Sequence, residues 1–190
     1  MKKLLALAPL ALLAACGGKD PVSYSAPVGI SLPVASKDAS SGSISVGKNI
    51  NTESGNPYGA FVNAARARIG HDPSRIELAA TTLKLLPGTS VGVNALEEVF
   101  TGPVTISFQM NGTNATYPAA QIVNPVGVGP VSLSVGFDSS SLPDADRASL
   151  LQGQFKVLLS GSPPGGATGA FATGSDLADL VATFEFVAFE

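Results

Sequence analysis

Residues 102–110 read Gly102-Pro103-Val104-Thr105-Ile106-Ser107-Phe108-Gln109-Met110, and this stretch decides the fold class. From Val104 onward every second side chain is apolar, and those between are Thr, Ser and Gln. Such alternation is typical of a β-strand with one face buried and the other in water. A near repeat, Gly-Pro-Val-Ser-Leu-Ser-Val-Gly-Phe-Asp, occupies residues 129–138. The two segments predict strands of a sheet that is apolar on its inner face.

Other segments predict the remaining strands. Apolar side chains recur with a period of two in residues 28–34, 44–50, 155–159 and 180–188, and a further strand is expected at residues 117–123. Pro33 would place the first strand at a sheet edge, because proline has no N–H to donate. In residues 75–86 the apolar residues Ile76 and Leu78 occupy even positions, whereas Leu83 and Leu85 occupy odd positions. We therefore expect a bulge or break at residues 79–82, where this strand passes between sheets.

The period becomes helical in residues 57–69, where positions 58, 61, 62, 65 and 69 are apolar. Asn56 is placed to cap this segment, Pro57 stands at its first position and Gly70 follows its end. The sequence predicts a helix that covers one face or mouth of the sheet. A second short helix is expected to begin at residues 141–144 and to end at Gly153.

These elements predict an all-β fold: an immunoglobulin-like antiparallel β-sandwich of about eight strands with one or two short helices, favoured over a closed barrel. The 21 glycines and 14 prolines suit short strands joined by turns. Residues 28–190 are expected to form a single domain. A chain of this length can bury about 70% of the surface that its unfolded state exposes, so no disulfide is needed.

The N-terminal residues have the pattern of a targeting segment. Met1-Lys2-Lys3 is followed by an apolar run over residues 4–15. This run is shorter than the roughly 20 residues of a membrane-spanning helix, and it matches the apolar region of a secretory signal. The chain's only cysteine, Cys16, comes next, after Leu13-Ala14-Ala15 and before Gly17-Gly18.

This arrangement resembles the lipobox of bacterial lipoproteins, over residues 1–18 only. The resemblance implies that residues 1–15 are a signal peptide that is removed, that acyl chains such as palmitate are attached to Cys16, and that the new amino terminus is acylated. Gly17, which is not Asp, resembles the residue found in lipoproteins that are sorted to the outer membrane. The alternative is an ordinary secretory signal whose small residues happen to precede a cysteine.

Residues 16–27 are expected to be the lipidated cysteine and a flexible tether, because they show no period. The expected location is the cell envelope, at the outer membrane, with the membrane as a partner through the lipid anchor. Two of the 11 basic residues precede Cys16, which leaves nine against 14 acidic residues. Nucleic acid is therefore not expected as a partner, and neither is an electrostatic hold on anionic lipid.

Catalytic motifs are weak. Residues 88–92 fit G-x-S-x-G, but the strand and helix that a nucleophile elbow needs are not indicated around Ser90. The only histidine, His71, precedes this serine, whereas the α/β-hydrolase order places it last. We therefore expect no enzyme and a glycine-rich turn at this position.

Metal and cofactor motifs are equally sparse. One histidine and no free thiol exclude the usual zinc sites. Calcium is conceivable at Asp138, Asp144 and Asp146, although helix caps explain these residues more simply. We expect no cofactor and no metal.

Three function classes remain. The first is a lipid-anchored, non-catalytic protein of the cell envelope with a structural or protein-binding role. The second is a carrier or receptor for a small apolar ligand held between the sheets, and the third is a hydrolase with a site on the loops. The last strand offers one candidate partner surface, because Val187 and Phe189 make its outer face more apolar than those of the other strands. A helix such as residues 57–69 could instead cover that face.

Overall fold

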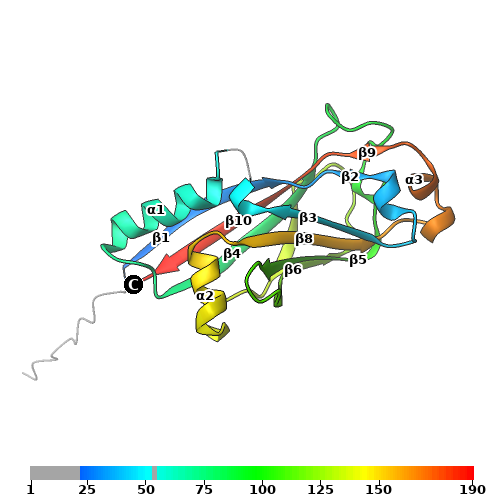
Figure 1. Ribbon diagram of the computed structural model, residues 1–190. Coiled ribbons are helices and arrows are strands. Elements are labelled where there is room, and N and C mark those ends of the chain that lie inside the picture. Colours follow the sequence, from blue (N-terminus) through cyan, green and yellow to red (C-terminus); the bar gives the residue numbers. More distant parts are fainter. Residues whose placement is uncertain (1–21, 53–54) are drawn as a thin grey trace, which may run out of the picture.

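Eight antiparallel strands form one sheet in the computed structural model, which describes residues 22–52 and 55–190 (Figure 1). The strand order is β1-β10-β4-β7-β6-β5-β8-β3, and β2 and β9 form a separate two-stranded sheet. The strands are β1 (Ser23–Ser31), β2 (Val34–Ala35), β3 (Ile44–Asn49), β4 (Arg75–Leu85), β5 (Thr101–Met110), β6 (Thr116–Val123), β7 (Val131–Val135), β8 (Phe155–Ser162), β9 (Leu177–Ala178) and β10 (Leu180–Phe189).

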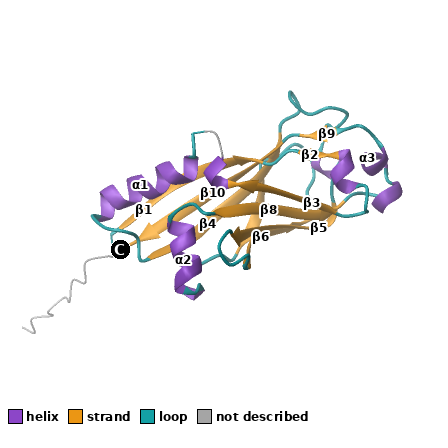
Figure 2. Ribbon diagram, in the orientation of Figure 1, coloured by secondary structure: helices purple, strands orange, loops and turns teal. Residues whose placement is uncertain are grey.

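Within the described residues, three α-helices lie around the strands, as Figure 2 shows. They are α1 (Pro57–Ile69), α2 (Asp144–Leu151) and α3 (Ala170–Thr173). Short 3₁₀ turns occupy η1 (Ser36–Ala39), η2 (Ile50–Thr52), η3 (Leu96–Glu98), η4 (Ser139–Ser141) and η5 (Gly166–Thr168).

The alternation in residues 102–110 predicts the faces of β5 correctly. Val104, Ile106, Phe108 and Met110 are fully buried, and the residues between them are not. β10 shows the same pattern, because Leu180, Ala182, Phe184, Phe186 and Ala188 all face the core. The all-β, antiparallel character expected from the sequence is confirmed.

The sheet is folded over so that its two halves face each other. The half β1-β10-β4-β7 joins the half β6-β5-β8-β3 through only two residue pairs, between β6 and β7. Phe108 of β5 and Phe184 of β10 have ring centroids 5.6 Å apart, although their strands are four positions apart in the sheet. A flat sheet would separate them by roughly 19 Å. Among the described residues the halves form one continuous sheet, so an immunoglobulin-like sandwich of two sheets is not confirmed.

Helix α1 fills the gap between the two halves. The ring of Tyr58 lies edge-on to Phe155 of β8 at 5.0 Å and to Phe186 of β10 at 5.1 Å. Phe61 packs against Tyr24 of β1 at 5.9 Å. The helix begins and ends at the predicted residues: Asn56 Oδ1 accepts a hydrogen bond from Gly59 N at 2.9 Å, and Gly70 has φ of 93°. A left-handed residue of this kind is the usual helix terminator.

Strand β4 contains the predicted bulge. Glu185 of β10 pairs with Ala80 and the next residue, Phe186, pairs with Leu78, so Ala79 is the extra residue. The bulge allows both Leu78 and Leu83 to face the core. The expected passage between sheets is wrong, because β4 stays between β10 and β7 along the same sheet.

Two segments have more structure than expected. β1 begins at Ser23 and pairs with β10 from Phe189 onward, so residues 23–27 are strand although they were expected to be tether. Tyr24 and Ala26 are partly buried and alternate with exposed residues in step with Val28, and Tyr24 packs against Phe61, so the strand pattern extends to Ser23. Residues 160–168 have a glycine- and proline-rich composition that is typical of a loop. Instead β8 continues to Ser162, and η5 and α3 follow.

The domain has two ends. We call the end that contains Val22, Arg75, Phe189 and Glu190 the proximal end, and the opposite end the distal end. At the proximal end Glu190 N–H donates to the Val22 carbonyl at 3.0 Å. The distal end contains β9, α3 and the loops 86–100 and 124–130, on the side away from the C-terminus (Figure 1). Each long strand therefore joins a proximal loop to a distal loop.

The ring cluster predicts a large loss of stability on truncation. Phe108→Ala or Phe184→Ala should lower the free energy of unfolding by about 3–5 kcal/mol, because each removes a fully buried ring. Chemical denaturation of the wild type and variants measures this. The control is Val123→Ala, whose side chain is 62% exposed and should change stability by less than about 0.5 kcal/mol. Equal effects at both kinds of position would contradict the assignment of faces.

Candidate functional site

The candidate partner residues lie on the outer face of β10. Val187 and Phe189 alternate with the buried Phe186 and Ala188 and are half-buried. Arg75 of β4 lies over the Phe189 ring, with its guanidinium carbon 4.1 Å from the ring centroid. Helix α1 packs on the opposite face through Phe61 and Phe186, so it does not cover these residues. Cys16, the candidate lipidation residue, lies outside the described residues.

The candidate nucleophile and base are far apart. Ser90 Oγ donates to the Leu86 carbonyl at 2.9 Å and accepts from Asp179 N–H at 3.0 Å. Both contacts stabilise the turn after β4. His71 precedes β4 and Ser90 follows it, so the 11 residues of this strand separate them by on the order of 30 Å. The two residues do not form a catalytic pair in this structure.

The three candidate calcium ligands do not converge. Asp138 caps η4 and pairs with Arg75 at 3.5 Å. Asp144 pairs with Arg147, and its side chain is 93% exposed. Asp146 lies in the first turn of α2 and is buried. Within residues 22–52 and 55–190, no group of three or more potential ligands could hold a metal ion.

Asp146 has a structural environment that the sequence did not indicate. It is only 2% exposed, and it accepts hydrogen bonds from Thr113 Oγ1 at 2.5 Å and from the Tyr117 hydroxyl. These bonds attach α2 to the β5–β6 turn and to β6. The hydrogen bond to Asp146 is the main cause that raises the pKa of Tyr117 above its usual value, and burial adds to it. A helix-start aspartate carries no sequence signal that distinguishes this role from a cap.

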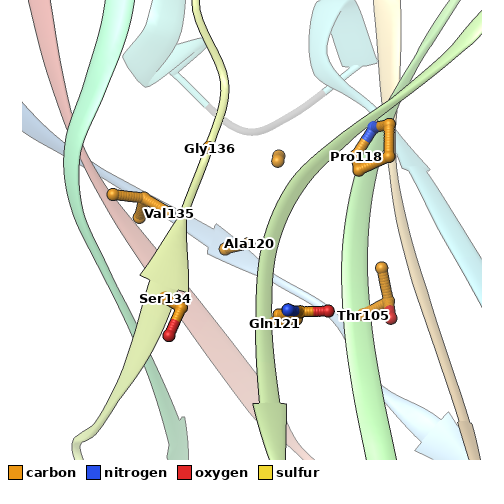
Figure 3. A pocket seen from close by; sticks show the side chains of 8 residues that line it. Thr105, Pro118, Ala120, Gln121, Ser134, Val135 and Gly136 are labelled. Carbon is orange, nitrogen blue, oxygen red and sulfur yellow. The ribbon is translucent and has the colours of Figure 1, made fainter.

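A shallow pocket of ≈ 220 Å³ lies at the junction between the two halves of the sheet. Figure 3 shows Ser134 and Val135 of β7, Gln121 of β6 and Thr105 of β5 around it. Its lining contains no ionisable side chain. The pocket offers hydroxyl and amide groups for hydrogen bonding, and it lacks a group that could act as an acid, a base or a charged ligand.

The core leaves little support for an apolar carrier. Phe108 contacts Phe137, Phe155, Phe184 and Phe186, with ring centroids 4.8–5.9 Å apart. Rings at these distances are in direct contact. Around Phe108 the space between the halves is therefore filled by side chains.

No family model matches this chain, and no curated protein matches it. Among the helices of the described residues, none combines the length and the apolar character that crossing a membrane requires.

The Asp146 contacts predict a specific loss of stability. Asp146→Ala should lower the free energy of unfolding by about 1–3 kcal/mol, because hydrogen bonds to a charged group are lost. Asp144→Ala, two residues earlier in the same helix and exposed, is the control and should cost less than about 0.5 kcal/mol. Chemical denaturation at neutral pH compares the two. Similar values for both would exclude a clamp at Asp146.

The pH dependence provides a second measurement. Folding raises the pKa of Tyr117, mainly through its hydrogen bond to Asp146. The stability that this shift contributes is complete below the pKa of an unfolded tyrosine, about 10. This contribution is lost as pH rises through the folded pKa. Tyr58, whose pKa is also raised because it is buried, adds to the same loss. In Asp146→Ala the loss of stability above about pH 10 should therefore be smaller than in the wild type, because only Tyr58 still contributes to it. Chemical denaturation at a series of pH values measures this loss.

Proposed function

We propose that this protein is a lipid-anchored, non-catalytic component of the cell envelope, located at the outer membrane, whose β domain has a structural or protein-binding role. The observation that carries the proposal is the lipobox-like sequence at residues 13–16, which stands six residues before Val22. β1 begins directly afterwards, at Ser23. A lipid at Cys16 would thus attach directly to the start of the folded domain.

The short connection supports an orientation. Six residues span at most roughly 20 Å when fully extended, so an anchor at Cys16 keeps the proximal end close to the membrane. β10 has ten residues and spans about 33 Å. The distal end would therefore be presented away from the lipid surface, where other envelope proteins can reach it.

The non-catalytic assignment is supported by the positions of the reactive side chains. Ser90 holds a turn and is remote from His71, and the acidic residues Asp138, Asp144 and Asp146 are engaged in separate local contacts. A hydrolase with a loop-borne site and a carrier for an apolar ligand are the alternatives. We also retain the immunoglobulin-like sandwich as a proposal for the fold, supported by the facing halves of the sheet.

The anchor is tested by replacing the acylated residue. Cys16→Ser should abolish labelling with a radioactive or clickable fatty acid, because the thiol is the acceptor. It should also release the protein from membranes or leave an uncleaved precursor, since stable attachment requires more than one acyl chain. Membrane fractionation and mass spectrometry measure both effects.

The control separates the lipobox from the thiol alone. In the Cys16→Ser background, Ser25→Cys adds an exposed cysteine outside the signal sequence, and labelling should not return. Unlabelled wild-type protein would exclude a lipid anchor and favour an ordinary secretory signal.

The outer face of β10 is proposed as a partner or self-association surface near the anchor. Val187→Ser combined with Phe189→Ser should reduce self-association of the protein, which analytical ultracentrifugation of the purified chain in detergent measures. The melting temperature should stay nearly constant, because both side chains face outward. A large drop in melting temperature would instead assign these residues to the packing of the domain, through the Arg75 contact.

A further inference from the structure

The distal end carries an unusual concentration of exposed apolar side chains. The five most exposed large apolar residues of the described chain are all valines, and four of them lie at this end. Val91 is 58% exposed, Val123 and Val126 are 62% exposed, and Val128 is 41% exposed. Isolated exposed apolar residues are ordinary on protein surfaces, but a concentration of them marks an interaction site.

Backbone hydrogen bonds hold these valines on neighbouring segments. The Val128 carbonyl accepts from Leu85 N–H at 2.9 Å, and the Gly127 carbonyl accepts from Leu96 N–H at 2.8 Å. Val91 N–H donates to the Leu177 carbonyl at 2.8 Å. The loops 86–100 and 124–130 are therefore fixed to β4 and β9, and their exposed side chains are presented by an ordered backbone.

Carboxylates accompany the valines. Glu97 and Glu98 lie in η3, and Asp176 precedes β9. The ion pairs among the described residues involve other carboxylates, namely Asp72, Glu77, Asp138 and Asp144. Within the described part of the chain, the three distal carboxylates therefore have no cation partner. We call Val91, Val123, Val126, Val128, Glu97, Glu98 and Asp176 the distal surface.

A pocket of ≈ 330 Å³ opens between two of these carboxylates. Glu98 and Asp176 line it together with Val93, Asn94 and Phe171. Gly92, with φ of 70°, makes room for the Asp176 side chain, because a Cβ at this glycine would lie 2.1 Å from its carboxylate oxygen. The volume is at the low end for ligand pockets, so it suits one long side chain better than a whole small molecule.

We propose that the distal surface docks a cationic amphipathic segment of a protein partner, with apolar side chains on the valines and a lysine or arginine in the pocket between Glu98 and Asp176. The charge complementarity selects this occupant: an acidic or neutral apolar segment would leave the two carboxylates desolvated without a counter-charge. The proposal rests on the proposed function for its orientation, in which the distal surface faces away from the membrane.

The test measures binding of a defined peptide to the purified full chain in detergent micelles. The probe is a fluorescein-labelled 14-residue peptide of Leu and Lys with amphipathic spacing, followed by fluorescence anisotropy. The signal from protein-free micelles is subtracted for every peptide, because an amphipathic peptide also binds detergent. Glu98→Gln with Asp176→Asn should weaken binding at least tenfold, and so should Val126→Ser with Val128→Ser. Val126 and Val128 are exposed, whereas Glu98 accepts a hydrogen bond from Asn94 N–H at 2.8 Å and Asp176 is half-buried beside Gly92. Glu98→Gln keeps an oxygen that can accept this bond, and an unchanged melting temperature verifies the fold of both variants.

Matched controls separate this surface from net charge. Asp144→Asn with Glu185→Gln removes the same charge elsewhere and should change the affinity less than twofold. A peptide of Lys and Ser, with the same charge and no apolar face, should bind at least tenfold more weakly than the Leu and Lys peptide. The proposal would be overturned if the two charge variants weakened binding equally, or if the two peptides bound equally well. It would also be overturned if both distal variants left binding unchanged.

The anchor and the docking surface can fail separately. Cys16→Ser, tested in the same micelles, should bind the Leu and Lys peptide as tightly as the wild type. If the wild type is not labelled by fatty acid, the proposed anchor and the orientation based on it are wrong. The Glu98→Gln with Asp176→Asn and Val126→Ser with Val128→Ser variants would still test peptide binding at the distal surface.

Discussion

The contact between Phe108 and the two rings of β10 is the interaction on which the rest of the structure depends. Phe108 lies 5.6 Å from Phe184 and 5.9 Å from Phe186, across a sheet whose halves share only two residue pairs. Backbone hydrogen bonds at that junction are too few to fix the angle between the halves. Burial of the rings on both inner faces holds the sheet folded, and it also creates the gap that Tyr58 of α1 fills.

Local signals in the sequence predicted local structure well. Asn56, Pro57 and Gly70 mark the ends of α1 because capping depends on a few neighbouring residues. The change of parity in β4 predicted the bulge at Ala79, because a strand cannot turn its side chains to the other face without an extra residue. The course of the sheet could not be predicted in this way. Alternation identifies the buried face of β7, but it does not reveal that β7 pairs with β6.

The candidate site was predicted less completely. The sequence placed Val187 and Phe189 on the outer face of β10 correctly, but it did not indicate that Arg75 lies over the Phe189 ring from another strand. The role of Asp146 was not predictable, because its partners Thr113 and Tyr117 lie about 30 residues earlier in the chain. The distal surface was missed for a related reason. Val91 and Val126 belong to loops without a period, and only the fold brings their loops to the same end as Asp176.

The pairing of β1 with β10 has a mechanical consequence for an anchored protein. β1 is an edge strand that pairs only with β10, over the nine residues Ser23–Ser31. If the anchor pulls at the proximal end of β1 while a partner pulls at the distal end of the domain, the force runs along the strand. All of its ladder hydrogen bonds are then loaded together in shear, and none can open singly. A pull applied between Val22 and Glu190, which lie at the same end of this ladder, would instead open it one residue pair at a time.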